Sequence, residues 1–374
     1  MVSRKNRILL TVIIFTFFSC TEEPSIEEIP ATHSKIKYVG RIDSSINGMV
    51  KFSWSGVSIE TMFEGTSIGI SLKDGKNDYN VFIDGKLYKI LSTTTDSIYI
   101  LADSLADTLH HFFMTKRTEA ALGMAEFGGF ILEEDKSLFP TKYTSQRKIE
   151  FIGDSFVAGF GNEGDSPDCP FSRETENNYY AYGSILARRL DAEYHVEAIS
   201  GTGVVRNYGD SNTVSARPFP SYFDLIHFYP DSVKWNFQKW QPDAVIVRLG
   251  RNDFWSQPFP KREEFRTAYK KFIETIRDVY PAADIFCLCG PVRKDLHCNY
   301  INSVVGEFRL KNKDKKIHFV KLDIQLNKPE DFGCQLHPNI KGHNKIADFL
   351  EPIIRREMGW QKEKKLSSNR KSTF

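Results

Sequence analysis

The chain of 374 residues lacks an excess of charge of either sign, because 50 lysines and arginines stand against 48 aspartates and glutamates. This balance gives no indication of the broad basic surface by which proteins bind nucleic acid, so we expect no nucleic-acid partner. The chain also lacks internal repeats and low-complexity segments. Hydrophobic residues make up 41% and aromatic residues 13%, which is ample for buried cores and argues against disorder. The length favours two domains.

Cysteine is scarce, with six residues, and no cluster of His, Cys and Asp has the spacing of a zinc site. We therefore expect no metal. Apart from Cys20, the cysteines are odd in number, and their spacing fixes no pairing. Cys287 and Cys289 share one face of a predicted strand, which predicts buried, small apolar side chains rather than a bridge. The cysteines other than Cys20 are Cys169, Cys287, Cys289, Cys298 and Cys334.

The apolar run at the N-terminus, residues 8–18, is too short to cross a bilayer. Basic residues precede it and Ser19-Cys20 follows, which is typical of a targeting segment. It resembles a bacterial lipoprotein signal, in which the cysteine is lipidated and becomes the mature N-terminus, although Phe17 replaces the usual leucine. An ordinary signal peptide is the alternative. We expect an exported bacterial lipoprotein, periplasmic or on the cell surface, that is anchored to the membrane only through Cys20.

Two patterns of secondary structure divide the remaining chain. Residues 35–133 form short alternating segments separated by turn signals such as Asp74-Gly75, which predicts a β-sandwich of jelly-roll type. Later residues alternate strand-like with helical runs, which predicts an α/β domain with a mainly parallel sheet between two helical layers. The predicted strands are 149–153, 193–199, 243–249, 283–289 and 317–322, and the predicted helices are 178–190, 262–280, 295–312 and 341–356. The predicted segments are a signal peptide at 1–20, a tether at 21–34, the jelly roll at 35–140, the α/β/α domain at 141–360 and a basic tail at 361–374.

One Gly-Asp-Ser tripeptide, residues 153–155, directly follows a strand-like run, whereas its two other copies lie in polar loops. Open α/β sheets place their ligands at the carboxyl ends of strands, so Ser155 is the candidate nucleophile. A serine hydroxyl needs a base to take its proton, and His337, fixed by Pro338 before the last helix, is the candidate. Acyl transfer also needs oxyanion donors. The candidates are the backbone N–H groups of Ser155 and Gly201 and the side-chain amide of Asn252.

Two residues beside Asn252 are candidate substrate contacts. Trp255 could form a wall on which a sugar stacks, or could equally be part of the core. Arg251 could contact a substrate oxygen or an acidic sugar, or could be paired outward in a salt bridge. The sequence alone leaves both alternatives open.

The order Gly-Asp-Ser, glycine, Asn-Asp, His-Pro resembles that of the SGNH (GDSL-like) hydrolases. Segments of the predicted sandwich, such as Gly40-Arg41-Ile42-Asp43 and residues 116–120, resemble the second family of carbohydrate esterases, in which a jelly roll precedes the SGNH domain. The resemblance implies a cofactor-free serine esterase, with Ser155 and His337 as catalytic residues. It implies removal of O-acetyl groups from an acetylated oligo- or polysaccharide such as xylan or mannan. We expect a monomer.

The chain departs from this pattern where the histidine's acidic partner is expected. SGNH hydrolases usually place the acid three residues before the histidine, and carbohydrate esterases often place it two before; these positions are Cys334 and Gln335. The resemblance allows a Ser-His dyad in which a main-chain carbonyl orients the histidine. Asp331 or Asp323 acting from a loop is an alternative.

Two alternative functions remain. One is a carbohydrate-binding lipoprotein with a decayed hydrolase domain, and the other is an SGNH esterase of lipids or long acyl chains.

Overall fold

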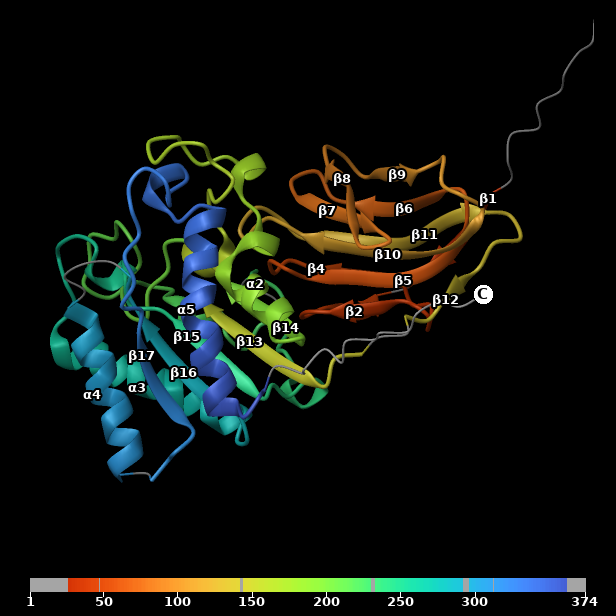
Figure 1. Cartoon of the computed structure of the whole chain (residues 1–374). Coiled ribbons are helices and arrows are strands. Elements are labelled where there is room, and N and C mark those ends of the chain that lie inside the picture. Colours follow the sequence, from red (N-terminus) through yellow and green to blue (C-terminus); the bar gives the residue numbers. More distant parts are fainter. Residues whose placement is uncertain are drawn as a thin grey trace, which may run out of the picture.

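A computed structural model describes residues 26–46, 48–141, 144–229, 233–291, 296–311 and 313–361. The predicted signal peptide, Cys20 and most of the basic tail lie outside the described residues. Figure 1 shows the two predicted domains side by side, an all-β domain in red to yellow and an α/β domain in green to blue. Among the described residues, none of the helices combines the length and apolar character needed to cross a membrane.

The N-terminal domain is the predicted β-sandwich, built from two six-stranded antiparallel sheets. One has the order β3-β4-β11-β6-β9 with β1 added on β11, and the other has the order β12-β5-β10-β7-β8 with β2 added on β5. Alternate residues of β5 are buried, as expected of strands with one face against a core. The strands are β1 Ile26–Pro30, β2 Lys37–Val39, β3 Asp43–Ile46, β4 Met49–Phe52, β5 Ser58–Gly65, β6 Ile68–Lys73, β7 Asp78–Ile83, β8 Lys86–Ser92, β9 Ser97–Ala102, β10 Thr108–Lys116, β11 Ala125–Glu133 and β12 Leu138–Phe139.

The sandwich begins earlier than predicted, because part of the expected tether is a strand. β1 pairs antiparallel with β11, from Ile26 opposite Glu133 to Pro30 opposite Gly129. The neighbouring strand β4 pairs only with residues 125–127 of β11, so β1 completes that edge. A short acidic segment that ends in proline gives no strand signal of its own, which is why this part of the prediction was wrong.

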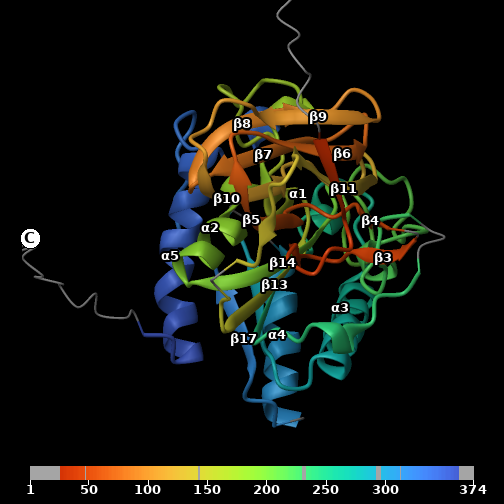
Figure 2. The ribbon, with the colours of Figure 1, turned by 90° about the vertical axis from the view of Figure 1, so that its right-hand side faces the viewer.

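The C-terminal domain contains a five-stranded parallel sheet in the order β14-β13-β15-β16-β17, with helices on both faces, as predicted. Successive residues of these strands point to opposite faces of the sheet and so belong to different hydrophobic cores. Phe151 and Ile246 pack with α2 and α5 on one face. Ile152 and Val247 pack with α3 and α4 on the other. Figure 2 shows α5 and α3 on opposite sides of the sheet. The elements are β13 Arg147–Gly153, α1 Ser155–Ala158, α2 Tyr182–Arg189, β14 Ala192–Ala198, β15 Ala244–Arg248, α3 Arg262–Val279, β16 Asp284–Cys289, α4 Leu296–Lys311, β17 Ile317–Lys321 and α5 Ile340–Met358.

Buried ion pairs join the two domains. Arg41, from the loop after β2, lies 2.7 Å from Glu150 of β13 and 2.9 Å from Glu197 of β14, and all three side chains are fully buried. Its guanidinium also donates to the carbonyl of Leu225 at 3.1 Å. Because an unpaired charge at such a site would be very costly, this contact holds the sandwich in one position against the parallel sheet.

Four of the cysteines form two disulfides, Cys169–Cys334 and Cys289–Cys298. The prediction that Cys289 is simply a buried apolar residue was therefore wrong, because its partner comes from the first turns of α4. Cys287, on the same strand, is buried and free, as predicted. The bridge at Cys334 occupies one of the two positions where an acid was expected.

Candidate active site

The segment that carries Ser155 is fixed at the end of β13. Asp154 caps helix α1 by accepting the N–H of Phe156 at 3.1 Å, and its carboxylate pairs with Arg248 at 2.6 Å. Arg248 is the last residue of the neighbouring strand β15, so the pair ties the turn that carries Ser155 to the sheet. Gly153 is required in this turn, since a Cβ atom there would lie 2.8 Å from the carbonyl oxygen of Arg248. Asp154 therefore braces the loop, and Ser155 stands at the carboxyl edge.

His337 reaches the serine directly. Its Nε2 lies 2.8 Å from Ser155 Oγ, and its Nδ1 lies 3.0 Å from the main-chain carbonyl oxygen of Gln335. A carbonyl can only accept a hydrogen bond, so Nδ1 carries the proton and Nε2 is free to accept from the serine hydroxyl. Asp331 does not serve as a partner of the histidine, because its carboxylate accepts the N–H of Asn327 at 2.7 Å and pairs with Lys345 at 2.5 Å.

An unusual backbone turn aims this carbonyl at the imidazole. Gln335 has φ 50° and ψ 43°, and Leu336 has φ 57°, so two consecutive residues other than glycine adopt the left-handed conformation. Each such residue costs about 1–3 kcal/mol and persists only where the surroundings impose it. Here the N–H groups of residues 334, 335 and 336 donate to the carbonyls of Gly161, Cys169 and Pro167 at 3.0, 3.2 and 3.1 Å.

The environment of His337 favours its neutral form. The side chain lies against Phe160 and Phe156, with ring centroids 4.4 and 5.5 Å away. Burial is the main reason that the pKa of His337 is lowered, and the positive charge of Arg248 acts in the same direction. Asp154 and the carbonyl of Gln335 oppose this shift. The neutral imidazole is the form that can accept a proton.

We expect any hydrolysis by this Ser-His pair to persist at a lower pH than an ordinary histidine would allow. Activity should fall as the pH drops through the pKa of His337, because the protonated ring can no longer take the serine proton. Since the pKa of His337 is lowered, the midpoint of the acid limb of kcat/KM should lie below about 6.5. Hydrolysis of an aryl acetate measured from pH 4 to 8 tests this, and a midpoint above about 6.5 contradicts it.

The predicted oxyanion donors come from adjacent strand ends. β13 lies between β14 and β15 in parallel register, with Gly153 opposite Ala198 and Arg248. Gly201 follows β14 with φ 76°, a conformation that favours glycine. Asn252 follows β15, and its Nδ2 donates to the carbonyl of Thr202 at 2.9 Å, which joins the two loops and leaves its second amide hydrogen for another acceptor.

Two buried carboxylates that the sequence analysis did not single out hold the loop after β14. Asp253 accepts the N–H groups of Val204, Val205 and Arg206 at 2.9, 2.7 and 2.9 Å. Glu119, from the sandwich, accepts the N–H of Ser200 at 2.8 Å. The sequence indicated Asp253 only as the second residue of the Asn-Asp pair and gave no sign of its role in this loop. Glu119 lies in a segment noted for its resemblance to the carbohydrate esterases, but nothing in the sequence placed it beside this loop.

The contact from Glu119 predicts that the sandwich contributes to turnover. Glu119→Ala should lower kcat by about tenfold, or about 1.4 kcal/mol, because the turn carrying Gly201 loses its acceptor. Glu119→Gln keeps an oxygen at that place and should retain most of the activity. Steady-state kinetics with a thermal melt of each variant test this. Equal kcat values for the two variants would contradict the positioning role.

Of the two candidate substrate residues, Trp255 is exposed and Arg251 is half-buried, and Tyr208 is an exposed neighbour of Trp255. The side chain of Trp255 is 47% exposed and that of Tyr208 is 57% exposed, and their ring centroids lie 5.9 Å apart. Trp255 is therefore not a core residue. The guanidinium of Arg251 lies 4.7 Å from the centre of the Trp255 ring, so it packs on this aromatic side chain. Among the described residues, no three His, Cys, Asp or Glu side chains form a group that could hold a metal ion.

The comparisons with known proteins agree with this architecture. Residues 38–141 match the family model described as carbohydrate esterase 2 N-terminal, and residues 151–345 match the GDSL-like lipase/acylhydrolase family. A solved family two carbohydrate esterase from Clostridium thermocellum, in complex with cellohexaose, is 35% identical, with a TM-score of 0.82. The alignment covers 87% of this chain and 100% of that one. The chain belongs to the second family of carbohydrate esterases.

Two curated relatives of this family 2 member carry names that describe activities. The cellulase/esterase CelE of Acetivibrio thermocellus is 37% identical over 333 residues, which cover 87% of this chain but only 40% of CelE. An acetylxylan esterase/glucomannan deacetylase of Cellvibrio japonicus is 27% identical over 85% of this chain and 89% of its own length. The chain is thus a member of a family of ester hydrolases.

Proposed function

We propose that this family 2 member removes O-acetyl groups from carbohydrates, using Ser155 as nucleophile and His337 as general base. The observation that carries the proposal is the 2.8 Å contact between Ser155 Oγ and His337 Nε2 at the carboxyl edge of the sheet. The names of its relatives support acetylated xylan and glucomannan as substrate classes.

In the acylation step, Ser155 Oγ attacks the acetyl carbonyl and His337 Nε2 takes the hydroxyl proton. The carbonyl oxygen becomes an oxyanion, and the N–H groups of Ser155 and Gly201 with the amide of Asn252 stabilise its charge. Ser155 is the first residue of α1, so its N–H has no acceptor within that helix. His337 then protonates the departing sugar oxygen, which leaves an acetyl-enzyme.

Deacylation uses the same residues with water as the nucleophile. Water attacks the acetyl carbonyl of the acetyl-enzyme while His337 takes a proton from the water, and His337 then gives this proton to Ser155 Oγ as acetate leaves. Through both steps Nδ1–H donates to the carbonyl of Gln335, which keeps the imidazole in one tautomer and stabilises the imidazolium. A neutral acceptor can do this without a carboxylate. The reaction needs no cofactor.

Acetate release from acetylated xylan, acetylated glucomannan and acetylated monosaccharides tests the proposal, together with a fluorophosphonate probe whose site of attachment is mapped. We expect acetate release and labelling at Ser155. A protein that binds these glycans without labelling or acetate release would be the decayed carbohydrate-binding protein instead. Faster hydrolysis of long-chain than of acetyl aryl esters would favour an esterase of lipids or acyl chains.

The exposed ring of Trp255 should stack on a sugar residue of the substrate. Trp255→Ala should raise KM for an acetylated oligosaccharide about tenfold, since losing an aromatic contact of this kind costs on the order of 1.5 kcal/mol. KM for a small aryl acetate should change little. Trp360→Ala is the matched control, because Trp360 lies beside Arg147 at the opposite end of β13. Equal effects on KM for both substrates would contradict the stacking of a sugar residue on Trp255.

We also propose that the protein is exported and anchored through Cys20, on the basis of its N-terminal sequence. Disulfides are typical of oxidising compartments, and the two bridges support export. Fractionation of cells that express the full chain tests this. The wild type should stay with the membrane and Cys20→Ala should be released; a variant that remains membrane-bound would argue against a lipid anchor.

A further inference from the structure

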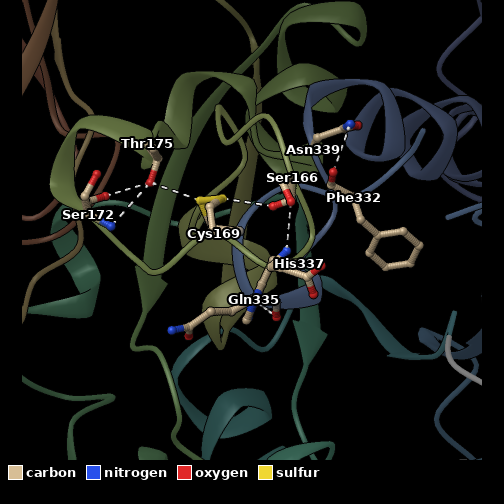
Figure 3. Close-up of a disulfide and its surroundings, with 10 residues drawn as sticks. Ser166, Cys169, Ser172, Thr175, Phe332, Gln335, His337 and Asn339 are labelled. Carbon is tan, nitrogen blue, oxygen red and sulfur yellow. Dashed lines mark hydrogen bonds between the residues drawn. A yellow bond between two sulfur atoms is a disulfide. The ribbon is translucent and has the colours of Figure 1, made fainter. Parts of the chain in front are cut away.

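The disulfide Cys169–Cys334 joins the two segments that supply the proposed catalytic residues. Its sulfur atoms link positions 165 residues apart in sequence. Cys169 lies in the loop that follows the nucleophile helix α1, and Cys334 lies three residues before His337. Figure 3 shows Gln335 and His337 directly below the bridge. The bridge therefore cross-links the loop that follows Ser155 to the turn that precedes His337.

The bridge is closely packed against the chain that follows Ser155. A Cβ atom on Gly164 would lie 2.3 Å from Cys334 Sγ and 2.7 Å from Cys169 Sγ, and one on Gly161 would lie 2.8 Å from Cys334 Cβ. Cys334 is fully buried. These glycines let the backbone approach the sulfur atoms, so the bridge cannot shift without moving the segment after the nucleophile.

Both halves of the bridge act on Gln335. Cys334 is its covalent neighbour, and the carbonyl of Cys169 accepts the Gln335 N–H at 3.2 Å. Gln335 and Leu336 are held in the left-handed conformation, which turns the Gln335 carbonyl toward His337 Nδ1. Residues other than glycine leave this conformation readily unless their surroundings impose it. A covalent link at residue 334 is a constraint of that kind.

We propose that Cys169 and Cys334 are positioning residues of the esterase reaction: their disulfide holds Gln335 so that its carbonyl orients His337. In this arrangement a covalent bond and a main-chain oxygen do the work that an acidic side chain does in a Ser-His-Asp triad. The inference rests on the proposed Ser-His mechanism. Its consequence is that turnover depends on the oxidised state of this one bridge.

Reduction converts the bridge into two thiols, with the electrons and protons supplied by dithiothreitol, which becomes a cyclic disulfide. Treated enzyme should lose at least tenfold in kcat on an aryl acetate while KM changes less than twofold. Removing dithiothreitol and reoxidising should restore kcat. Cys169→Ala/Cys334→Ala should show the same loss and no further response to dithiothreitol.

The second bridge provides the matched control. Cys289→Ala/Cys298→Ala removes the other disulfide, which closes a short loop between residues nine apart in sequence, and leaves Gln335 untouched. Its kcat should stay within threefold of wild type and should still fall on reduction. Thermal melts must show each form folded at the assay temperature. If the Cys169→Ala/Cys334→Ala variant does not fold, the Cys289→Ala/Cys298→Ala variant is folded first and then reduced, and it is assayed below the melting temperature of its reduced form.

A reduced or doubly substituted enzyme that is folded and keeps kcat within twofold of wild type would overturn the positioning role. An equal loss in the Cys289/Cys298 variant would overturn it too, because the effect would then be general destabilisation. Failure of the underlying mechanism has a different signature, since activity would then survive Ser155→Ala. Loss of activity on Ser155→Ala with full activity after reduction rejects only the role of the disulfide.

Discussion

Ser155→Ala should lower kcat for an acetylated oligosaccharide by about 10⁴- to 10⁶-fold, because no other hydroxyl in the proposed mechanism can form the acetyl-enzyme. The variant should still bind the glycan, since the exposed aromatic side chains at the site are unchanged. Acetate release and isothermal titration, measured on the same preparation, test both statements. Retained acetate release would reject Ser155 as the nucleophile.

His337→Ala should produce a loss of similar size, and combining it with Ser155→Ala should add little, because the two residues act as a unit. Asp331→Asn is the matched control, since it changes the nearest sequence candidate for an acid. Its carboxylate pairs with Lys345 rather than with the histidine. We expect kcat of Asp331→Asn to stay close to wild type; a loss approaching that of His337→Ala would restore Asp331 as the acid.

The hydrolase domain was predictable because each of its strands and helices carries a local pattern of apolar residues. Buried parallel strands give continuous apolar runs and amphipathic helices give a 3.6-residue period, so predicted strand 283–289 and helix 262–280 correspond to β16 and α3 within one residue at each end. Strand β1 was not predicted, because residues 26–30 show neither of these patterns. Its pairing depends on an open stretch of β11, from Gly129 to Glu133, which lies far along the chain and which no local pattern reveals.

The site was predictable where chemistry needs a particular side chain. Ser155 and His337 were found because a nucleophile and its base require a hydroxyl and an imidazole, and the structure brings them within hydrogen-bond distance. The partner of His337 was not predictable as a particular residue, because any amino acid carries a main-chain carbonyl. Which carbonyl faces the ring depends on the left-handed turn at Gln335 and on a disulfide whose pairing the cysteine spacing did not fix.

Asn252→Ala should lower kcat by about 10²- to 10³-fold, since removing one oxyanion donor typically raises the barrier by about 2.7–4 kcal/mol. The loss should fall on kcat rather than KM, because the donor acts on charge that develops only in the transition state. One amide hydrogen of Asn252 already joins it to the carbonyl of Thr202, which fixes the direction of the other. Arg251→Ala is the neighbouring control: its side chain packs on Trp255, so it should change KM for an oligosaccharide more than kcat. If Asn252→Ala lost less than about fivefold in kcat, the two backbone N–H groups alone would form the oxyanion hole.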